Sequence, residues 1–343
     1  MTLRHRPIPR LGAQSGGHGG SLSLAGSKIA WFNTVERRSE DGAMKVISPA
    51  GLDGAGRARL SGARPDLCGL SLDRPRVMGI VNVTPDSFSD GGDYARAEVA
   101  LGRAREMVAE GVDIIDIGGE STRPGAEEVP VAEEIARSVP VIAAIRAAGI
   151  ATPISIDTRK AAVAEAALDA GANIVNDVAA FSFDPELAAL CASRDVPVVL
   201  MHAQGLPADM QNNPAYGDVV AEVLGFLEGR IAYAVGQGVA RERIITDPGI
   251  GFGKTQEHNL ALLANLSSFH DLGLPVLLGA SRKRFIGAIG NAPDAKDRLG
   301  GSLAVALHGA AQGVQIVRVH DTSATIQALR LFAALNGAGE GDG

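Results

Sequence analysis

Short apolar runs alternate with stretches of helical periodicity along the chain from Arg76 onward, and eight such pairs can be counted. This alternation is typical of βα units around a parallel sheet. We expect strands at residues 77–83, 113–117, 153–156, 173–175, 196–201, 243–246, 275–278 and 314–319. We expect helices at residues 95–110, 131–148, 160–170, 186–193, 218–236, 257–266, 302–311 and 324–335.

The number of these units favours one architecture. Eight strands and eight helices over roughly 260 residues fit a closed (β/α)8 TIM barrel. Alternation alone also allows a doubly wound open sheet. We therefore predict the α/β class and a (β/α)8 barrel over residues 73–337, preceded by an extension of uncertain structure over 1–72 and followed by a flexible tail over 338–343.

Polar residues stand at or just after the successive strand ends. They are Asn82, Asp116, Asp157, Asn176, Asp177, His202, Asp247, Lys283, Arg318 and His320. The carboxyl ends of all strands in a parallel barrel meet at one rim. The sequence therefore predicts a single site assembled from distant parts of the chain.

Composition excludes several other classes. The net charge of -7 and the pI near 5.6 argue against a general nucleic-acid binder, which needs clustered Lys and Arg. The two cysteines, Cys68 and Cys191, support neither a disulfide framework nor a cysteine-rich metal site. We find neither the apolar core of a signal peptide nor an apolar run of membrane-spanning length, so we expect a cytoplasmic protein.

The extension over residues 1–72 is rich in Gly, Arg and Ser. We expect about its first 20 residues to be disordered. Residues 28–33 and 44–47 could form short strands, and residues 52–60 could form a turn of helix. The extension could cover the outer barrel wall or assist dimer contacts.

Three loops at the predicted rim are candidates for binding. The first, residues 82–92, is polar and Gly-rich, and the second, residues 118–126, places Arg123 where it could move onto an anion. The third, residues 247–255, resembles a nucleotide-binding loop but fails in detail. A phosphate-binding loop would need Gly where Pro248 stands, and a dinucleotide fingerprint would need Gly at Lys254.

These loops, together with Ser281-Arg282-Lys283 and Arg318-Val319-His320-Asp321, resemble the dihydropteroate synthase family from about Arg76 to Leu335. The resemblance implies a transferase that joins 6-hydroxymethyl-7,8-dihydropterin diphosphate to p-aminobenzoate, with Mg²⁺ as cofactor. It also implies a homodimer formed through the outer helices. Ala203 and Leu206 stand where the family often has Met and Thr, and we expect little consequence.

The resemblance assigns roles to individual residues. Those implied for the pterin ring are Asp157, Asn176, Met201, Asp247, Phe252 and Lys283, with the Asp247 carboxylate accepting the ring's donor pair. Those implied for the diphosphate are Asn82, Thr122, Arg318 and His320, and Asn82 is also the implied Mg²⁺ ligand. Those implied for p-aminobenzoate are Phe88, Arg123 and Ser281, with Ser281 at the start of a helix near Arg282. The implied catalytic set is Asp157, Lys283, Arg123 and Asp86.

Other interpretations remain open at this point. Asp157 could simply cap the following helix. The whole chain could be a pterin-binding barrel that transfers a methyl group from methyltetrahydrofolate, although that reaction does not require Lys283 or the Arg318 and His320 pair. It could be a barrel that has lost activity, or a metallohydrolase using His202 and His320, whose spacing does not suit a permanent metal site.

Overall fold

A closed parallel barrel forms the body of the protein. A computed structural model describes residues 3–12, 20–39, 42–83, 93–121, 126, 128–205 and 210–337, with the backbone alone at 93–96. The barrel strands are β7 (Arg76–Asn82), β8 (Ile114–Gly118), β9 (Ile154–Asp157), β10 (Ile174–Asp177), β11 (Val198–Met201), β12 (Ile244–Asp247), β13 (Leu277–Leu278) and β14 (Ile316–Val319). Their order in the eight-stranded sheet is β12-β11-β10-β9-β8-β7-β14-β13. A parallel bridge between Thr246 and Val276 joins the two ends of the sheet, which confirms the predicted TIM-like barrel rather than an open sheet.

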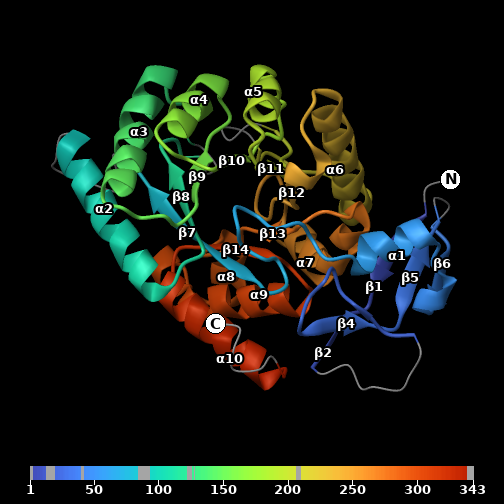
Figure 1. Ribbon diagram of the computed structural model, residues 1–343. Helices are drawn as coiled ribbons and strands as arrows, with labels where there is room; N and C mark the ends of the chain where they lie inside the picture. Colours follow the sequence, from blue (N-terminus) through green and yellow to red (C-terminus); the bar gives the residue numbers. More distant parts are fainter. Residues whose placement is uncertain are drawn as a thin grey trace.

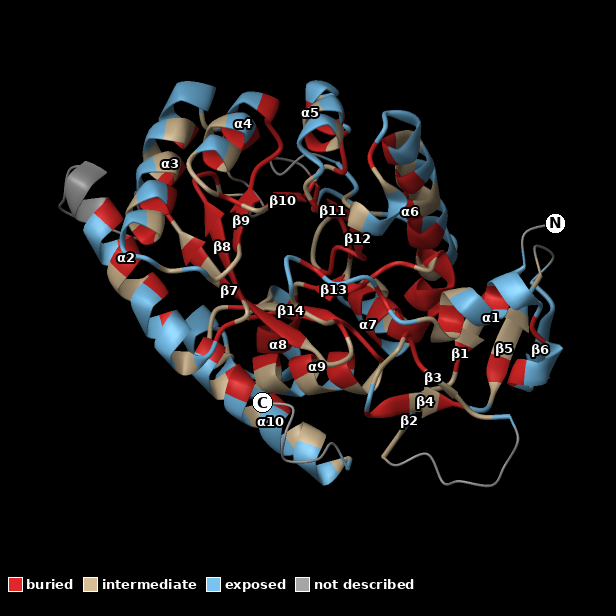
Figure 2. Cartoon of the chain, in the orientation of Figure 1, coloured by how far each residue is buried: buried red, intermediate tan, exposed pale blue. Residues whose placement is uncertain are grey.

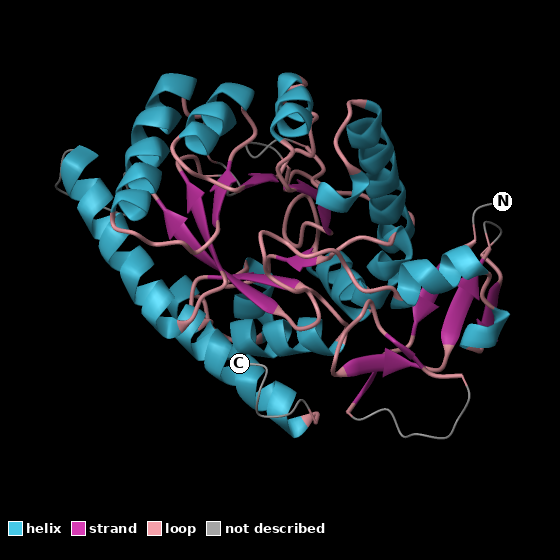
Figure 3. Ribbon diagram, in the orientation of Figure 1, coloured by secondary structure: helices cyan, strands magenta, loops and turns pink. Residues whose placement is uncertain are grey.

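Helices surround the strands on the outside (Figures 1 and 3). They are α2 (Asp93–Glu110), α3 (Val131–Ala147), α4 (Ala161–Asp169), α5 (Glu186–Arg194), α6 (Val219–Gly236), α7 (Gln256–Ala264), α8 (Arg284–Ile289), α9 (Leu299–Ala311) and α10 (Thr322–Leu335). Shorter 3-10 turns lie at Pro49–Gly51, Arg241–Arg243, Leu266–Leu272 and Ala295–Asp297. No helix in the part of the chain that the structure describes is long and apolar enough to cross a membrane.

Alternate residues of each strand face opposite sides of the barrel wall. One set packs outward against the helices and belongs to the main hydrophobic core, as Ile115 and Val175 do. The other set fills the lower barrel interior with Met78, Ile114, Ile174, Val199, Ile245, Leu277 and Ile316. Leu67 and Leu72, just before the first barrel strand, pack onto this layer, so the interior has an apolar floor. Figure 2 shows the buried residues running along the strands and the inner faces of the helices.

The extension folds into two small antiparallel sheets and a helix. The sheets have the orders β1-β5-β6 and β2-β4-β3, from β1 (Arg4–Pro7), β2 (Arg10–Leu11), β3 (Leu22–Ser23), β4 (Ala30–Phe32), β5 (Val35–Arg38) and β6 (Met44–Ile47). Helix α1 (Gly54–Ser61) completes a separate core of Leu24, Ala30, Phe32, Val35, Leu52 and Leu60. The expectation that the first 20 residues are disordered is wrong for β1 and β2, which pair with β5 and β4.

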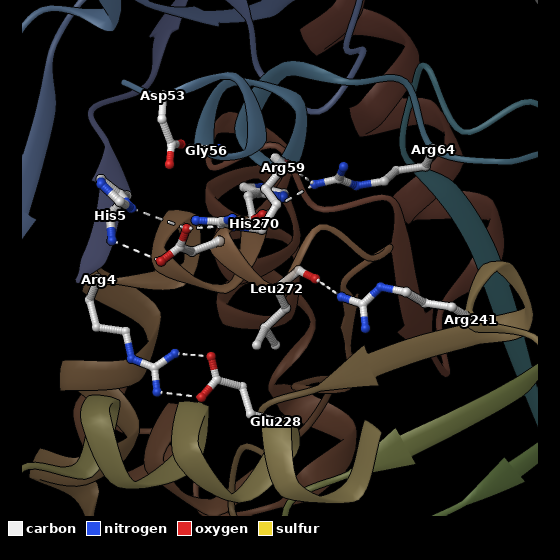
Figure 4. A network of polar contacts seen from close by, with 11 residues as sticks. Arg4, His5, Asp53, Gly56, Arg59, Arg64, Glu228, Arg241, His270 and Leu272 are labelled. Atoms are coloured by element: carbon white, nitrogen blue, oxygen red, sulfur yellow. Dashed lines mark hydrogen bonds and ion pairs between the residues drawn. The ribbon is translucent and has the colours of Figure 1, made fainter. Parts of the chain in front are cut away.

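Ionic contacts fix the extension to the barrel (Figure 4). Residues 1–72 carry ten Lys and Arg against five Asp and Glu, whereas the whole chain is acidic. Arg4 forms a two-point ion pair with Glu228 on α6. The buried Asp271 carboxylate accepts from the backbone N–H of His5 at 2.9 Å and from Nε of Arg59 at 3.2 Å. These contacts explain the order of β1, because its own sequence contributes little apolar area.

Candidate active site

The strand register brings one row of polar residues together at the carboxyl end of the barrel. Asn82 on β7 pairs with Gly118 on β8, Gly118 pairs with Asp157 on β9, and Asp157 pairs with Asn176 on β10. Gly118 has no side chain, and a Cβ there would lie 3.6 Å from Cβ of Asp157 and 3.9 Å from Oδ1 of Asn82. Asn82 and Asp157 therefore face each other across that glycine. The predicted convergence of Asn82, Asp157 and Asn176 is confirmed.

Arg318 joins this row from β14, the strand that pairs with β7. Its Nε donates to Oδ2 of Asp116 and its Nη2 donates to Oδ2 of Asp157, both at 2.6 Å. Nδ2 of Asn176 donates to Oδ1 of Asp116 at the longer distance of 3.4 Å. Asp116 is completely buried and Asp157 is nearly so. The result is one guanidinium between two buried carboxylates.

The electrostatics of Asp157 follow from this arrangement. Burial raises the pKa of the Asp157 carboxyl, Arg318 opposes that rise, and the neighbouring Asp116 charge adds to it. Burial lowers the pKa of Arg318, but the two carboxylates more than offset this and raise it above its ordinary value. Oδ1 of Asp157 is buried without a hydrogen-bond partner in the described structure. An unpaired buried oxygen is costly, so this atom is suited to meet a positively charged or donating ligand.

Asp247 lies at the end of β12, beside Met201 on β11 in the register of the two strands. Its Oδ1 accepts from the backbone N–H of Gly249 at 2.7 Å. Burial raises the pKa of Asp247 to about 6, and the charges of Lys283, Lys254 and Arg318 act against that rise. The charge of Arg318 therefore acts on Asp247, as expected for two side chains at the same rim of the barrel.

Lys283 and Phe252 form the adjacent wall. Nζ of Lys283 lies 3.9 Å from the centre of the Phe252 ring, a cation–π contact. Gly251, at a φ of +83°, lets the Lys283 side chain pass close, because a Cβ there would lie 3.1 Å from Cδ of Lys283. Met201, predicted as an apolar wall, is buried at the carboxyl end of β11.

Ser281 and His320 contact each other, although the family resemblance implies different ligands for them. Oγ of Ser281 accepts from the backbone N–H of His320 at 3.2 Å and lies 3.1 Å from its Nδ1. The helix expected to begin near Arg282 begins at Arg284 instead, and Arg282 adopts a positive φ of 58°. Ser281 therefore precedes the helix by three residues rather than starting it. Asp86, Phe88, Thr122 and Arg123 lie outside the described residues.

Asp177 was expected among the rim residues but is used inside its own loop. Its two carboxylate oxygens accept from the backbone N–H groups of Ala179 at 2.8 Å and Phe181 at 2.6 Å. It follows Asn176 on β10, and successive side chains on a strand face opposite ways. Asn176 faces the site, whereas Asp177 shapes the turn that follows.

The sequence assigns no role to Asp116 or to a group of charged residues behind the rim. Asp116 is a strand-end residue in the sequence, and in the structure it accepts from Nε of Arg318. Behind the rim, Glu120 accepts from Arg159 at 3.1 Å and from Lys160 at 3.3 Å. Lys160 also donates to Glu134 at 2.8 Å. Long-range pairings of this kind leave no periodic signal, so only an unusual density of charge near a strand end could have indicated them.

The described residues hold no cluster of three or more His, Cys, Asp or Glu side chains able to bind a metal. Asn82 contributes a neutral, hard oxygen at the end of β7. Mg²⁺ often keeps most of its waters and binds through substrate phosphate with one or two protein ligands. These residues fit a metal that arrives with a phosphorylated substrate better than a permanent one.

Comparison with known proteins identifies the family. A family model described as pterin binding enzyme matches residues 78–320. The dihydropteroate synthase of a Synechocystis species is 48% identical over 262 residues, which cover 76% of this chain and 90% of that protein. The chain belongs to the dihydropteroate synthase family, transferases of folate biosynthesis.

Solved dihydropteroate synthase structures agree with this assignment. One from Xanthomonas albilineans with 4-aminobenzoic acid has a TM-score of 0.74 at 48% identity, covering 79% of this chain and 97% of that chain. Another, from the same organism in complex with 7,8-dihydropteroate, has a TM-score of 0.70 at 45% identity, covering 78% and 95%. The extension before residue 78 lies outside the family model.

Proposed function

We propose that this chain condenses 6-hydroxymethyl-7,8-dihydropterin diphosphate with p-aminobenzoate to give 7,8-dihydropteroate and pyrophosphate. The main support for this proposal is the ion pair between Arg318 and Asp157. The charge of Arg318 also acts on Asp247. A dihydropterin diphosphate has a flat ring rich in donors at one end and an anion at the other. The rim offers buried carboxylates for the first and Arg318 for the second.

The pterin ring is held by the residues at the ends of β10, β11 and β12. Asp247 accepts from the ring's amino group and adjacent N–H, and Asn176 contacts the same edge. Lys283 donates to the carbonyl side of the ring. Met201 and Phe252 cover its apolar surface. Support comes from the burial of Asp247 and from the position of Lys283 over Phe252.

The diphosphate is held at the β7 and β14 side of the rim. The contacts of Arg318 with Asp116 and Asp157 use Nε and Nη2, which leaves Nη1 for a phosphate oxygen. His320 and Thr122 assist, and Asn82 would hold Mg²⁺. When bound, the ion neutralises charge on the departing pyrophosphate.

The reaction transfers the pterin methylene carbon from oxygen to nitrogen. The bond between that carbon and the diphosphate oxygen breaks, and its electron pair leaves with pyrophosphate. Positive charge develops on the pterin, and the Asp157 carboxylate, with its unpaired Oδ1, stabilises it. The aniline nitrogen of p-aminobenzoate then bonds to the carbon and releases a proton.

The second substrate occupies the outer part of the same mouth. Ser281 receives the carboxylate of p-aminobenzoate, and Phe88 and Arg123 complete its pocket. Asp86, Arg123 and Lys283 act with Asp157 in the catalytic set. The enzyme contributes mainly by positioning, because an aniline of low basicity needs no strong general base. We also propose that the enzyme is cytoplasmic and acts as a homodimer. Light scattering would test the dimer.

A product assay tests the reaction. The protein is incubated with dihydropterin diphosphate, p-aminobenzoate and Mg²⁺, and both pyrophosphate and dihydropteroate are measured. We expect equal amounts of the two products, and a loss of about 10²-fold or more in kcat for Asp157→Asn. Folded wild-type protein that forms neither product would contradict the proposed function. Full turnover by Asp157→Asn would contradict the role of Asp157 alone.

A further inference from the structure

A buried lysine lies in the loop that follows Asp247, the carboxylate proposed to bind the pterin, and the mechanism above does not use it. Lys254 is 3% exposed at the end of the glycine-rich loop that follows β12. Its Nζ lies 2.8 Å from Nδ1 of His202, 3.0 Å from the carbonyl oxygen of Phe252 and 3.3 Å from the carbonyl oxygen of His202. An ammonium group has three donors, so these three acceptors match a charged Lys254.

The contacts of Lys254 join two rim loops. One loop follows Asp247 at the end of β12 and carries Phe252, and the other begins at His202 after β11. Their backbones approach so closely that a Cβ on Gly249 would lie 1.8 Å from the carbonyl oxygen of His202. Gly249 also adopts a φ of +67°, which disfavours any side chain. The ammonium group of Lys254 sits at this crossing and binds a carbonyl oxygen from each loop.

A charged Lys254 donates to Nδ1 of His202, which leaves the His202 ring neutral with its proton on Nε2. Burial, followed by the Lys254 charge, lowers the pKa of His202 to about 3. Its ring packs edge-on against Phe226 with ring centres 4.8 Å apart. A neutral imidazole adds no charge to the site, so Lys254 is the cation on this side of Asp247.

We propose that Lys254 is a positioning residue that holds Asp247 in its anionic, ring-binding state. At the loop crossing that Lys254 occupies, the backbone N–H of Gly249 donates to Oδ1 of Asp247 at 2.7 Å. The charged groups that act on this carboxylate are Lys283, Lys254 and Arg318. Lys283 and Arg318 face the ligand space and engage the substrate. Lys254 is enclosed by protein, so its ammonium group stays at the loop crossing beside Asp247 and does not contact the ligand.

The electrostatic surroundings of Lys254 agree with this arrangement. Burial lowers the pKa of Lys254 to about 7, the Asp247 charge raises it, and Lys283 lowers it further. Each of the two groups therefore favours the charged form of the other. Removing the cation raises the pKa of Asp247, and the carboxylate is then lost at a higher pH.

The inference rests on the proposed function, and its test uses two variants of the full chain. Lys254→Gln removes the charge but keeps an N–H donor for the loop carbonyls, whereas Lys254→Met removes both. Lys296→Met, at an exposed position, is the matched control. The dissociation constant of 6-hydroxymethylpterin, which lacks titrating phosphates, is measured from pH 5 to 9, together with KM for p-aminobenzoate and thermal unfolding.

For both Lys254 variants we expect about tenfold weaker pterin binding near pH 6.5, recovery towards the wild-type value at pH 8.5, and a KM for p-aminobenzoate within about twofold of wild type. Lys296→Met should behave as wild type. A wild-type pH profile for Lys254→Gln, equal losses at all pH values, or failure of both variants to fold would overturn the proposal. A wild-type enzyme that forms no dihydropteroate would instead remove the proposed function.

Discussion

Nη2 of Arg318 lies 2.6 Å from Oδ2 of Asp157, although 161 residues of chain separate the two. The parallel barrel makes this contact possible, because it brings the ends of β14 and β9 to one rim. Asp116 holds Arg318 from a second direction. Arg318, the proposed anion-binding group, and Asp157, the carboxylate proposed to stabilise the pterin cation, therefore hold each other in position.

Removing the guanidinium should destabilise the protein strongly. Arg318→Met leaves two buried carboxylates without their cation, and we expect a loss of about 3 to 5 kcal/mol in the free energy of unfolding at pH 8. Without Arg318, burial raises the pKa of Asp157 further above its unfolded value, so the loss should shrink as the pH falls and this carboxylate becomes protonated. Urea unfolding at pH 8 and pH 5.5 measures both effects.

A surface pair provides the comparison for Arg318. Arg38 pairs with Asp218 at 2.6 Å, with both side chains well exposed. Arg38→Met should cost about 1 kcal/mol or less at either pH. One contradicting result is an equal loss in the free energy of unfolding for the two variants, and another is a loss for Arg318→Met that does not change with pH. Either result would show that the buried group of Arg318, Asp116 and Asp157 has no special role.

Pterin binding should weaken in acid. The pKa of Asp247 is raised to about 6, so below that value the carboxyl is protonated and presents a donor to the ring's own donors. We expect the affinity for 6-hydroxymethylpterin to fall about tenfold per pH unit below about pH 6. Asp247→Asn should weaken binding by about 10- to 150-fold above pH 7 and remove the acid limb. If the affinity of Asp247→Asn still falls in acid, another titrating group must cause the decrease.

The substrates should bind in order. If p-aminobenzoate enters after the diphosphate has organised the mouth, calorimetry should give an affinity about tenfold higher with pyrophosphate and Mg²⁺ than without them. Adding a chelator should abolish the difference, because Asn82 alone is a weak ligand for the ion. Equal affinity under all three conditions would contradict the ordered scheme.

The extension should be separable from catalysis. Phe32 is fully buried in its small core, so Phe32→Ala should cost that unit about 3 to 5 kcal/mol. We expect faster tryptic cleavage within residues 1–72 and near-normal turnover by the barrel. Met44→Ala, at a side chain that is 66% exposed, should change neither property. A parallel loss of turnover in Phe32→Ala would instead make the extension part of the working enzyme.

The barrel was predictable because its strands and helices have strong periodic signals. Short apolar and β-branched runs predicted every barrel strand to within a few residues, and the position of polar residues at strand ends predicted that Asp157 and Asn176 are neighbours. Strand β1 was missed because Arg4-His5-Arg6-Pro7 has no apolar pattern, and its order depends on Glu228 and Asp271 far along the chain.

Partner choice within the rim could not be predicted. Asn176 and Asp177 are adjacent strand-end residues of similar type, yet one faces the site and the other binds its own loop. The pairing of Arg318 with Asp116 depends on which side chains share a layer of the barrel. From the sequence, Lys254 serves only to exclude a dinucleotide fingerprint, because the burial of its side chain is not visible there.

A crystal structure of the protein with dihydropterin diphosphate and Mg²⁺ would locate both ends of the substrate. We predict the pterin amino group and ring N–H within hydrogen-bond distance of the Asp247 carboxylate, and the diphosphate at Arg318 and Asn82. A pterin ring bound away from Asp247, or a diphosphate directed away from Arg318, would contradict it.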